Sequence, residues 1–214
     1  MATQKFAGTG VAVTTPFKSN SSIDHEAVKK HIGFLKENQI DFLVILGTTG
    51  ESVTLSDDEK KALVDSVKEA NNNELPFVLG IGGNNTASVL EKIQKTDFNG
   101  IHGILSVVPS YNKPSQKGLY EHFKAISEKS PVPIILYNVP GRTGKNMEPE
   151  TIIQLANDCD NIIAVKEASG NFTQAMHLIQ NKPDDFTVLS GEDGITLPLM
   201  SIGFEGVISV IGNA

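Results

Sequence analysis

Short apolar runs alternate with longer amphipathic segments along the chain, and the alternation is repeated eight times. The runs are mostly β-branched, as expected for strands that are buried on both faces. Successive runs are spaced by roughly 20–35 residues, the size of one βα pair. The runs cover residues 10–17, 42–49, 77–83, 103–110, 133–140, 162–169, 186–192 and 206–211.

Eight strands that alternate with helices indicate an α/β fold and favour a (β/α)8 TIM barrel of parallel strands. An open, doubly wound sheet is the alternative, because periodicity does not show whether a sheet closes. We expect residues 1–214 to form this one domain, since a chain of this length can bury one core. The sequence stops just after the eighth run, so the barrel is expected to be C-terminally incomplete, without its eighth helix and any later helices.

Helix starts are marked between the runs. Ser56 followed by Glu59 predicts a capping box. Asp24, Ser115 and Asn171 also stand where helix-like segments begin, and Pro149 falls in a first turn, where its missing N–H is tolerated.

Composition excludes several classes of protein. The net charge is −7 and there is no basic run, which argues against a nucleic-acid partner. No apolar stretch is long enough to span a membrane, and the N-terminus lacks the apolar core of a signal peptide. Cys159 is the only cysteine, so no disulfide can form within the chain. We expect a cytoplasmic protein.

Lys166 is the most informative polar residue. It follows four apolar residues inside the sixth run, and active sites of such barrels lie at the carboxyl ends of the strands. Burial lowers the pKa of a lysine and increases the neutral amine, the form that attacks carbonyls. A structural lysine paired with Glu51, Glu167 or another carboxylate is the alternative.

Polar residues also end the neighbouring runs. Tyr137 ends the fifth run, where its phenol could relay protons. Arg142, the only arginine beside 17 lysines, follows in the loop and could grip a carboxylate with two hydrogen bonds. Tyr111 lies in the loop after the fourth run. The alternatives are a surface arginine without a partner and a tyrosine that packs on a neighbouring loop.

The turn Gly47-Thr48-Thr49-Gly50 ends the second run. Its backbone N–H groups and two hydroxyls could hold a small anion such as a carboxylate, although an ordinary βα turn would look the same. The five histidines are scattered and do not show metal-ligand spacing, so no metal site is expected.

Five motifs occur in a familiar order and spacing: FLVILGTTGES, VPSYNKP, ILYNVPGRTG, IIAVKEASG and LSGED. With them the chain resembles the dihydrodipicolinate synthase / N-acetylneuraminate lyase family, from about Gly8 to Ala214. No single motif is specific, but the set is.

The resemblance implies that Lys166 is the nucleophile and forms an imine with pyruvate, so that no separate cofactor is needed. It also implies a proton relay of Thr49, Tyr137 and Tyr111, with Tyr111 donated by the neighbouring subunit of a homodimer or homotetramer.

The same resemblance implies the substrate contacts. Thr48 and Thr49 would hold the carboxylate of pyruvate, and Arg142 would bind that of L-aspartate 4-semialdehyde. Gly191 and Ile208 would line the pocket.

The implied activity is condensation of these two substrates to 4-hydroxy-tetrahydrodipicolinate, in lysine and diaminopimelate biosynthesis. Arg142 and the Gly-Thr-Thr-Gly turn favour this branch of the family. A pyruvate-dependent lyase for N-acetylneuraminate or keto-deoxy sugar acids, and a barrel without catalytic activity, are the alternatives.

Feedback inhibition by lysine is expected to be weak or absent. Lysine-inhibited relatives tend to carry a tyrosine, two histidines and a glutamate where this chain has Ser110, Asp57, Lys60 and Ser88, although Asn84 is retained. Strong inhibition at sub-millimolar lysine would contradict this expectation.

Overall fold

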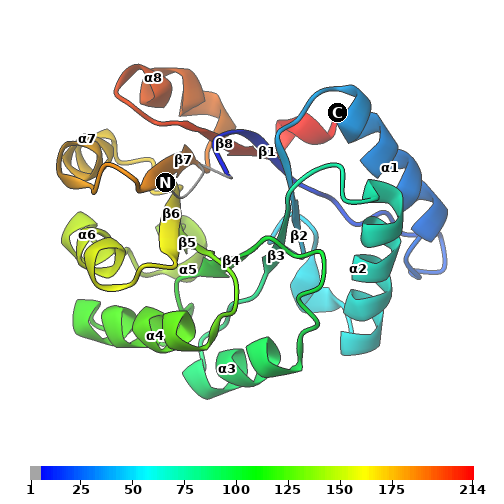
Figure 1. Cartoon of the computed structure of the whole chain (residues 1–214), viewed down its shortest axis with the longest axis horizontal. Helices are drawn as coiled ribbons and strands as arrows, with labels where there is room; N and C mark the ends of the chain where they lie inside the picture. Colours follow the sequence, from blue (N-terminus) through cyan, green and yellow to red (C-terminus); the bar gives the residue numbers. More distant parts are fainter. Residues whose placement is uncertain (1–5) are drawn as a thin grey trace.

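The computed structural model describes residues 6–214, in which eight parallel strands close into a barrel surrounded by helices (Figure 1). Each strand pairs with the next one along the chain, and β8 pairs back with β1. The predicted (β/α)8 barrel is confirmed, and the open sheet is wrong. The strands are β1 Gly8–Ala12, β2 Phe42–Ile45, β3 Phe77–Gly80, β4 Gly103–Val107, β5 Ile134–Asn138, β6 Ile162–Glu167, β7 Thr187–Ser190 and β8 Gly206–Ser209.

Helices follow the strands on the outside of the barrel. They are α1 His25–Glu37, α2 Asp57–Asn71, α3 Thr86–Lys95, α4 Gln116–Lys129, α5 Pro140–Thr143, α6 Pro149–Asp158, α7 Phe172–Asn181 and α8 Thr196–Ser201. Three short 3-10 turns are η1 Ser52–Thr54, η2 Asp193–Ile195 and η3 Ile211–Asn213.

The strands are shorter than the apolar runs that predicted them. β2 ends at Ile45, for example, and the rest of its run forms the turn above the barrel. The first strand instead begins earlier than predicted, at Gly8, because it closes the barrel against Gly206. A Cβ on Gly206 would lie only 2.0 Å from the carbonyl oxygen of Gly8, so this close approach requires glycine.

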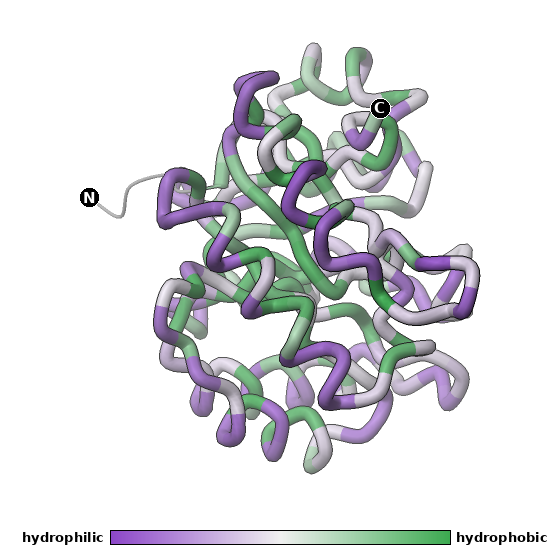
Figure 2. Tube along the Cα trace, turned by 90° about the vertical axis from the view of Figure 1, so that its right-hand side faces the viewer, coloured by the Kyte–Doolittle hydropathy of each residue, from purple (hydrophilic) through white to green (hydrophobic). Residues whose placement is uncertain are grey.

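Side chains divide between two apolar layers, because successive residues of a strand point to opposite faces. One layer fills the barrel and includes Phe42, Val44, Leu105 and Ile208. The other lies between barrel and helices, and includes Leu43. Figure 2 shows hydrophobic stretches along the strands in the middle of the molecule and hydrophilic stretches on the surrounding helices. Because apolar side chains fill the barrel interior, polar side chains that face it can gather only at the ends of the strands.

Caps fix where the helices begin. Ser56 and Glu59 form the predicted capping box at α2. The predicted caps Asp24, Ser115 and Asn171 each accept a hydrogen bond from a backbone N–H in the first turn of their helix. Such caps stabilise a helix by about 1 kcal/mol each.

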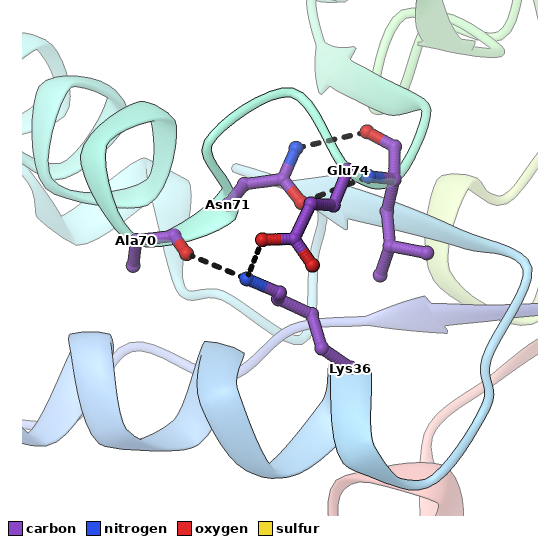
Figure 3. Close-up of polar contacts among 5 residues, drawn as sticks. Lys36, Ala70, Asn71 and Glu74 are labelled. Carbon is purple, nitrogen blue, oxygen red and sulfur yellow. Dashed lines mark hydrogen bonds and ion pairs between the residues drawn. The ribbon is translucent and has the colours of Figure 1, made fainter.

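A polar clamp joins α1 to the segment that enters β3 (Figure 3). Lys36 donates to the carbonyl of Ala70 (3.2 Å) and pairs with Glu74 (2.7 Å). The buried Asn71 donates to the carbonyl of Leu75 (2.8 Å) and accepts from its N–H (3.1 Å). The clamp precedes β3, and so lies at the end of the barrel opposite the loops that follow the strands.

Among residues 6–214, no helix is both long and apolar enough to cross a membrane.

Candidate active site

Lys166 lies inside the barrel on β6 and is 4% exposed. Its Nζ lies 4.5 Å from the centroid of the Tyr137 ring on β5. Burial lowers the pKa of Lys166 from 10.5 to about 8; Asp193 and Glu192 oppose this shift, and Arg142 adds to it. About one tenth of the amine is therefore neutral at pH 7, a few hundred times more than for a lysine with the ordinary pKa.

The alternative of a paired structural lysine fails on strand geometry. Glu167 follows Lys166 in β6 and so points out of the barrel, where it accepts hydrogen bonds from Asn138, Gln174 and Ser169. No carboxylate in the described part of the chain lies within 4.0 Å of the Lys166 amine, that of Glu51 included.

Gly191, just beyond β7, makes room for the lysine. A Cβ at this position would lie 2.9 Å from Cε and 3.0 Å from Cγ of Lys166, and 2.7 Å from Cβ of Ala168. Gly191 therefore contacts the side chain of Lys166 directly.

Tyr137 is paired in register with Lys166 and is buried in the interior layer. Burial raises the pKa of its phenol, while the charge of Arg142 and a hydrogen bond with the Thr48 hydroxyl lower it. The relay expected from the sequence contained Thr49 beside Tyr137. In the structure, Thr48 is the threonine whose hydroxyl interacts with the phenol.

Two residues in the left-handed region bracket the turn that carries the threonines. Leu46 has φ 58° and Glu51 has φ 54°, values that side chains other than glycine rarely adopt. The turn closes through bonds from Gly50 N–H to the Gly47 carbonyl (3.2 Å) and from Glu51 N–H to the Thr48 carbonyl (3.1 Å). Such strain is held only where the surrounding structure enforces it, and it is common at functional sites.

The N–H groups of Thr48 and Thr49 are not used by the turn. They donate to no protein group among residues 6–214. Free N–H groups in one turn can hold an anion.

Arg142 lies exposed on α5, directly after β5. Its charge lowers the pKa of both Lys166 and Tyr137, so the guanidinium is close enough to act on both groups. No carboxylate of the described residues pairs with it within 4.0 Å. An unpaired guanidinium at the mouth of the barrel suits an anionic ligand.

Tyr111 is 90% exposed, in the loop between β4 and α4, with φ 69°. Its backbone N–H donates to the carbonyl of Thr143 (3.3 Å), which brings the loop beside α5. Within residues 6–214 its hydroxyl makes no hydrogen bond, so the chain does not itself bring this phenol to Tyr137.

Ile208 is buried on β8 and belongs to the interior layer, below the site. The structure thus gathers Lys166, Tyr137, Thr48 and Gly191 around one point at the carboxyl ends of the strands. Within the described residues, no three or more His, Cys, Asp or Glu side chains are arranged to hold a metal ion.

Residues 5–214 match the Dihydrodipicolinate synthetase family. The chain belongs to this family. Among its curated relatives is the 4-hydroxy-tetrahydrodipicolinate synthase of Flavobacterium psychrophilum, 54% identical over 210 residues, which are 98% of this chain and 72% of the relative. The chain thus spans about 72% of the length of that relative.

Solved structures of the dihydrodipicolinate synthetase family have the same barrel. The dihydrodipicolinate synthase of Thermotoga maritima superposes with a TM-score of 0.94 at 40% identity, covering 98% of this chain and 72% of the other. The chloride-inhibited enzyme of Acinetobacter baumannii, solved with pyruvate, gives a TM-score of 0.93 at 36% identity, covering 97% and 71%.

Asp193 is a site residue that sequence reasoning missed, although the LSGED motif contains it. Its carboxylate accepts from the N–H groups of Val210 (2.9 Å) and Ile211 (3.2 Å), and it raises the pKa of Lys166. Its position in the loop after β7, two residues beyond Gly191, was the available signal.

Proposed function

We propose that this chain is a 4-hydroxy-tetrahydrodipicolinate synthase, a lyase that condenses pyruvate with L-aspartate 4-semialdehyde through an imine on Lys166. Lys166 carries the proposal, because it is an unpaired amine of lowered pKa inside the mouth of the barrel. The activity itself is supported by identity of 54% to a curated synthase over nearly the whole chain.

Imine formation follows from the neutral amine. Nζ of Lys166 attacks the C2 carbonyl of pyruvate, and the carbinolamine loses one water to give the imine. Loss of a proton from C3 gives the enamine, which forms the new carbon–carbon bond with the aldehyde carbon. The aldehyde oxygen becomes the hydroxyl of the product. The amino group of the semialdehyde then attacks the imine carbon, which closes the ring and releases the amine of Lys166. The reaction needs no cofactor besides this covalent imine.

Tyr137 is a proton carrier beside the amine, with its ring centroid 4.5 Å from Nζ. Its hydroxyl interacts with Thr48, which we place in the relay in preference to Thr49. A phenol whose pKa is raised by burial stays protonated near neutral pH and can donate to the leaving hydroxyl of the carbinolamine.

Two groups are available for the substrate carboxylates. The free N–H groups of Thr48 and Thr49 suit the carboxylate of pyruvate, and the unpaired guanidinium of Arg142 suits that of the aldehyde. Gly191 and Ile208 supply the apolar wall beside the imine.

A homodimer or homotetramer would complete the site, with Tyr111 of one subunit in the site of another. The side chain of Tyr111 is 90% exposed and stands on left-handed backbone, so it contributes little packing energy within its own chain. A cytoplasmic enzyme fits the single buried cysteine.

Borohydride trapping tests the proposal. The protein is incubated with pyruvate and reduced, and the intact mass of wild type is compared with that of Lys166→Ala. We expect one pyruvate-derived adduct on wild type and none on the variant, followed by turnover when the semialdehyde is supplied. A wild-type protein that gains no adduct would refute the imine, and an adduct without turnover would point to another aldehyde partner.

A further inference from the structure

A buried polar network lies behind the active site, on the outer face of β5 and β6. Tyr137 pairs in register with Lys166, and the next residues, Asn138 and Glu167, pair with each other. Because side chains alternate, the first pair points into the barrel and the second points outward. Asn138 is 0% exposed and Glu167 is 3% exposed.

Glu167 is surrounded by neutral donors. Its Oε2 accepts from Nδ2 of Asn138 (3.0 Å) and Nε2 of Gln174 (3.2 Å), and its Oε1 accepts from the backbone N–H of Ser169 (2.6 Å). No Lys, Arg or His side chain of the described residues lies within 4.0 Å of this carboxylate. A buried carboxylate without a cation is costly unless hydrogen bonds satisfy it, as they do here.

Backbone N–H groups fix the direction of these bonds. The N–H of Met147 can only donate, so it holds Oδ1 of Asn138 (2.9 Å) and turns Nδ2 of Asn138 toward Glu167. The N–H of Ser169 likewise requires an acceptor. Position 167 must therefore accept at both oxygens, which a glutamate can do and a glutamine cannot without an amide flip elsewhere.

The network reaches the catalytic groups through the backbone. The carbonyl of Asn138 accepts from Ala168 N–H, and that of Glu167 accepts from Gly191 N–H, both at 2.8 Å. Gly191 in turn contacts Cε of Lys166. The outer carboxylate is thus tied both to the strand that carries Tyr137 and to the glycine that bounds the lysine.

We infer that Glu167 is a positioning residue, whose carboxylate, through Asn138 and Gln174, holds β5 and β6 so that the amine of Lys166 and the phenol of Tyr137 stay aligned. The inference rests on the proposed function. Glu167 touches no substrate and acts from the opposite face of the strand. Small displacements of reacting groups cost on the order of 100-fold in rate.

Glu167→Gln tests the inference, because it keeps the shape and removes one acceptor. The readouts are the rate of borohydride-trappable adduct formation with pyruvate, kcat with both substrates, and thermal unfolding. We expect adduct formation and kcat to fall on the order of 10- to 100-fold, while the adduct still reaches one per chain.

Asn138→Asp in the Glu167→Gln background is the rescue. It moves the carboxylate to position 138, where it still accepts from Met147 N–H and can accept from the new amide. Asn146, whose Oδ1 accepts from Nδ2 of Asn138 (2.8 Å), must turn its amide to donate instead, and Gln174 turns with it. We expect the double variant to recover much of the lost rate, whereas a residue needed only for bulk packing would give additive losses.

Asn71→Asp is the matched control. It exchanges amide for carboxylate at an equally buried site in the clamp before β3, where the carbonyl of Leu75 needs a donor (Figure 3). It should lower stability and leave the trapping rate unchanged. If Glu167→Gln loses stability as Asn71→Asp does, yet traps pyruvate at the wild-type rate, Glu167 is only structural and the inference fails.

If Glu167→Gln does not fold, Gln174→Met decides, because it removes one donor and leaves the other two: slowed trapping supports the inference and an unchanged rate overturns it. If wild type itself forms no adduct, the proposed function fails, which is a result distinct from an adduct that the variant forms equally fast.

Discussion

The α-carbon of Gly191 lies against the side chain of Lys166, so closely that a Cβ would stand 2.9 Å from Cε of the lysine. Any larger residue must push the amine away from Tyr137 or shift the end of β7. Glycine is therefore needed at position 191 to leave room for the side chain of Lys166.

Gly191→Ala is expected to slow adduct formation with pyruvate on the order of 10- to 100-fold, because the displaced amine meets the carbonyl at a poor angle. Borohydride trapping with intact-mass detection measures this. Gly194→Ala is the control, since a Cβ there meets nothing within 4 Å in the same loop. Equal rates for the two variants would show that the contact with Lys166 is unimportant.

Lys166→Met is expected to stabilise the protein while abolishing the adduct. The unfolded chain keeps its lysine protonated up to about pH 10.5, whereas the folded chain releases the proton above about pH 8. Wild-type stability is therefore reduced below pH 8 and recovers between pH 8 and 10.5. At pH 7 the free energy of unfolding of the variant should be about 3 kcal/mol higher than that of wild type. Urea melts at pH 7 and pH 10.5 test this, and an equal gain at both would contradict the assignment to charge.

Adduct formation should rise with pH and level off above an apparent pKa of about 8, because only the neutral amine attacks. Arg142→Met should move this midpoint upward, since the guanidinium disfavours the ammonium form. Asp193→Asn should move it downward, since that carboxylate favours the ammonium form. Initial trapping rates between pH 6 and 10 give the midpoints; shifts of the opposite sign would refute this electrostatic account.

His122 should make the fold sensitive to acid. It is 5% exposed on α4, its Nδ1 bonds to the hydroxyl of Thr86 (2.8 Å), and burial lowers its pKa from 6.5 to about 4. The unfolded chain takes up a proton at a higher pH than the folded chain, so stability falls as pH drops from about 6.5 toward 4, by about 3 kcal/mol in all.

His122→Gln should remove that part of the pH dependence, and His177→Gln, on the exposed face of α7, should leave it. Unfolding free energies at pH 7 and pH 4.5 provide the comparison. A wild-type slope that survives in His122→Gln would assign the acid sensitivity to other groups.

Strand order and the position of Lys166 could be predicted because both depend on local pattern. An apolar run indicates that both faces of a strand are buried. The alternation of side chains along the strand then places Lys166 inside the barrel. The contact of the Thr48 hydroxyl with the phenol of Tyr137 could not be predicted, because it depends on a turn that starts from Leu46 in the left-handed region, which no residue preference indicates.

The hydrogen-bond network of Glu167 could not be predicted from the sequence either. Its partners stand 29, 7 and 2 residues away along the chain, and only the folded barrel brings them to one carboxylate. Pairing of Glu167 with Lys166 was one alternative that the sequence left open, and strand alternation excludes it. Polar contacts of this kind carry no periodic signal.

Closure of the barrel joins residues from opposite ends of the chain. Asn213 donates to the carbonyl of Ala12 (2.9 Å) and accepts from Thr14 N–H (3.1 Å), and β8 pairs with β1 along its length. A nascent chain on the ribosome therefore cannot seal the barrel until about 200 residues after β1 have been made. Until then the edge of β1 that later pairs with β8 stays open, and such an edge can pair with other chains during translation.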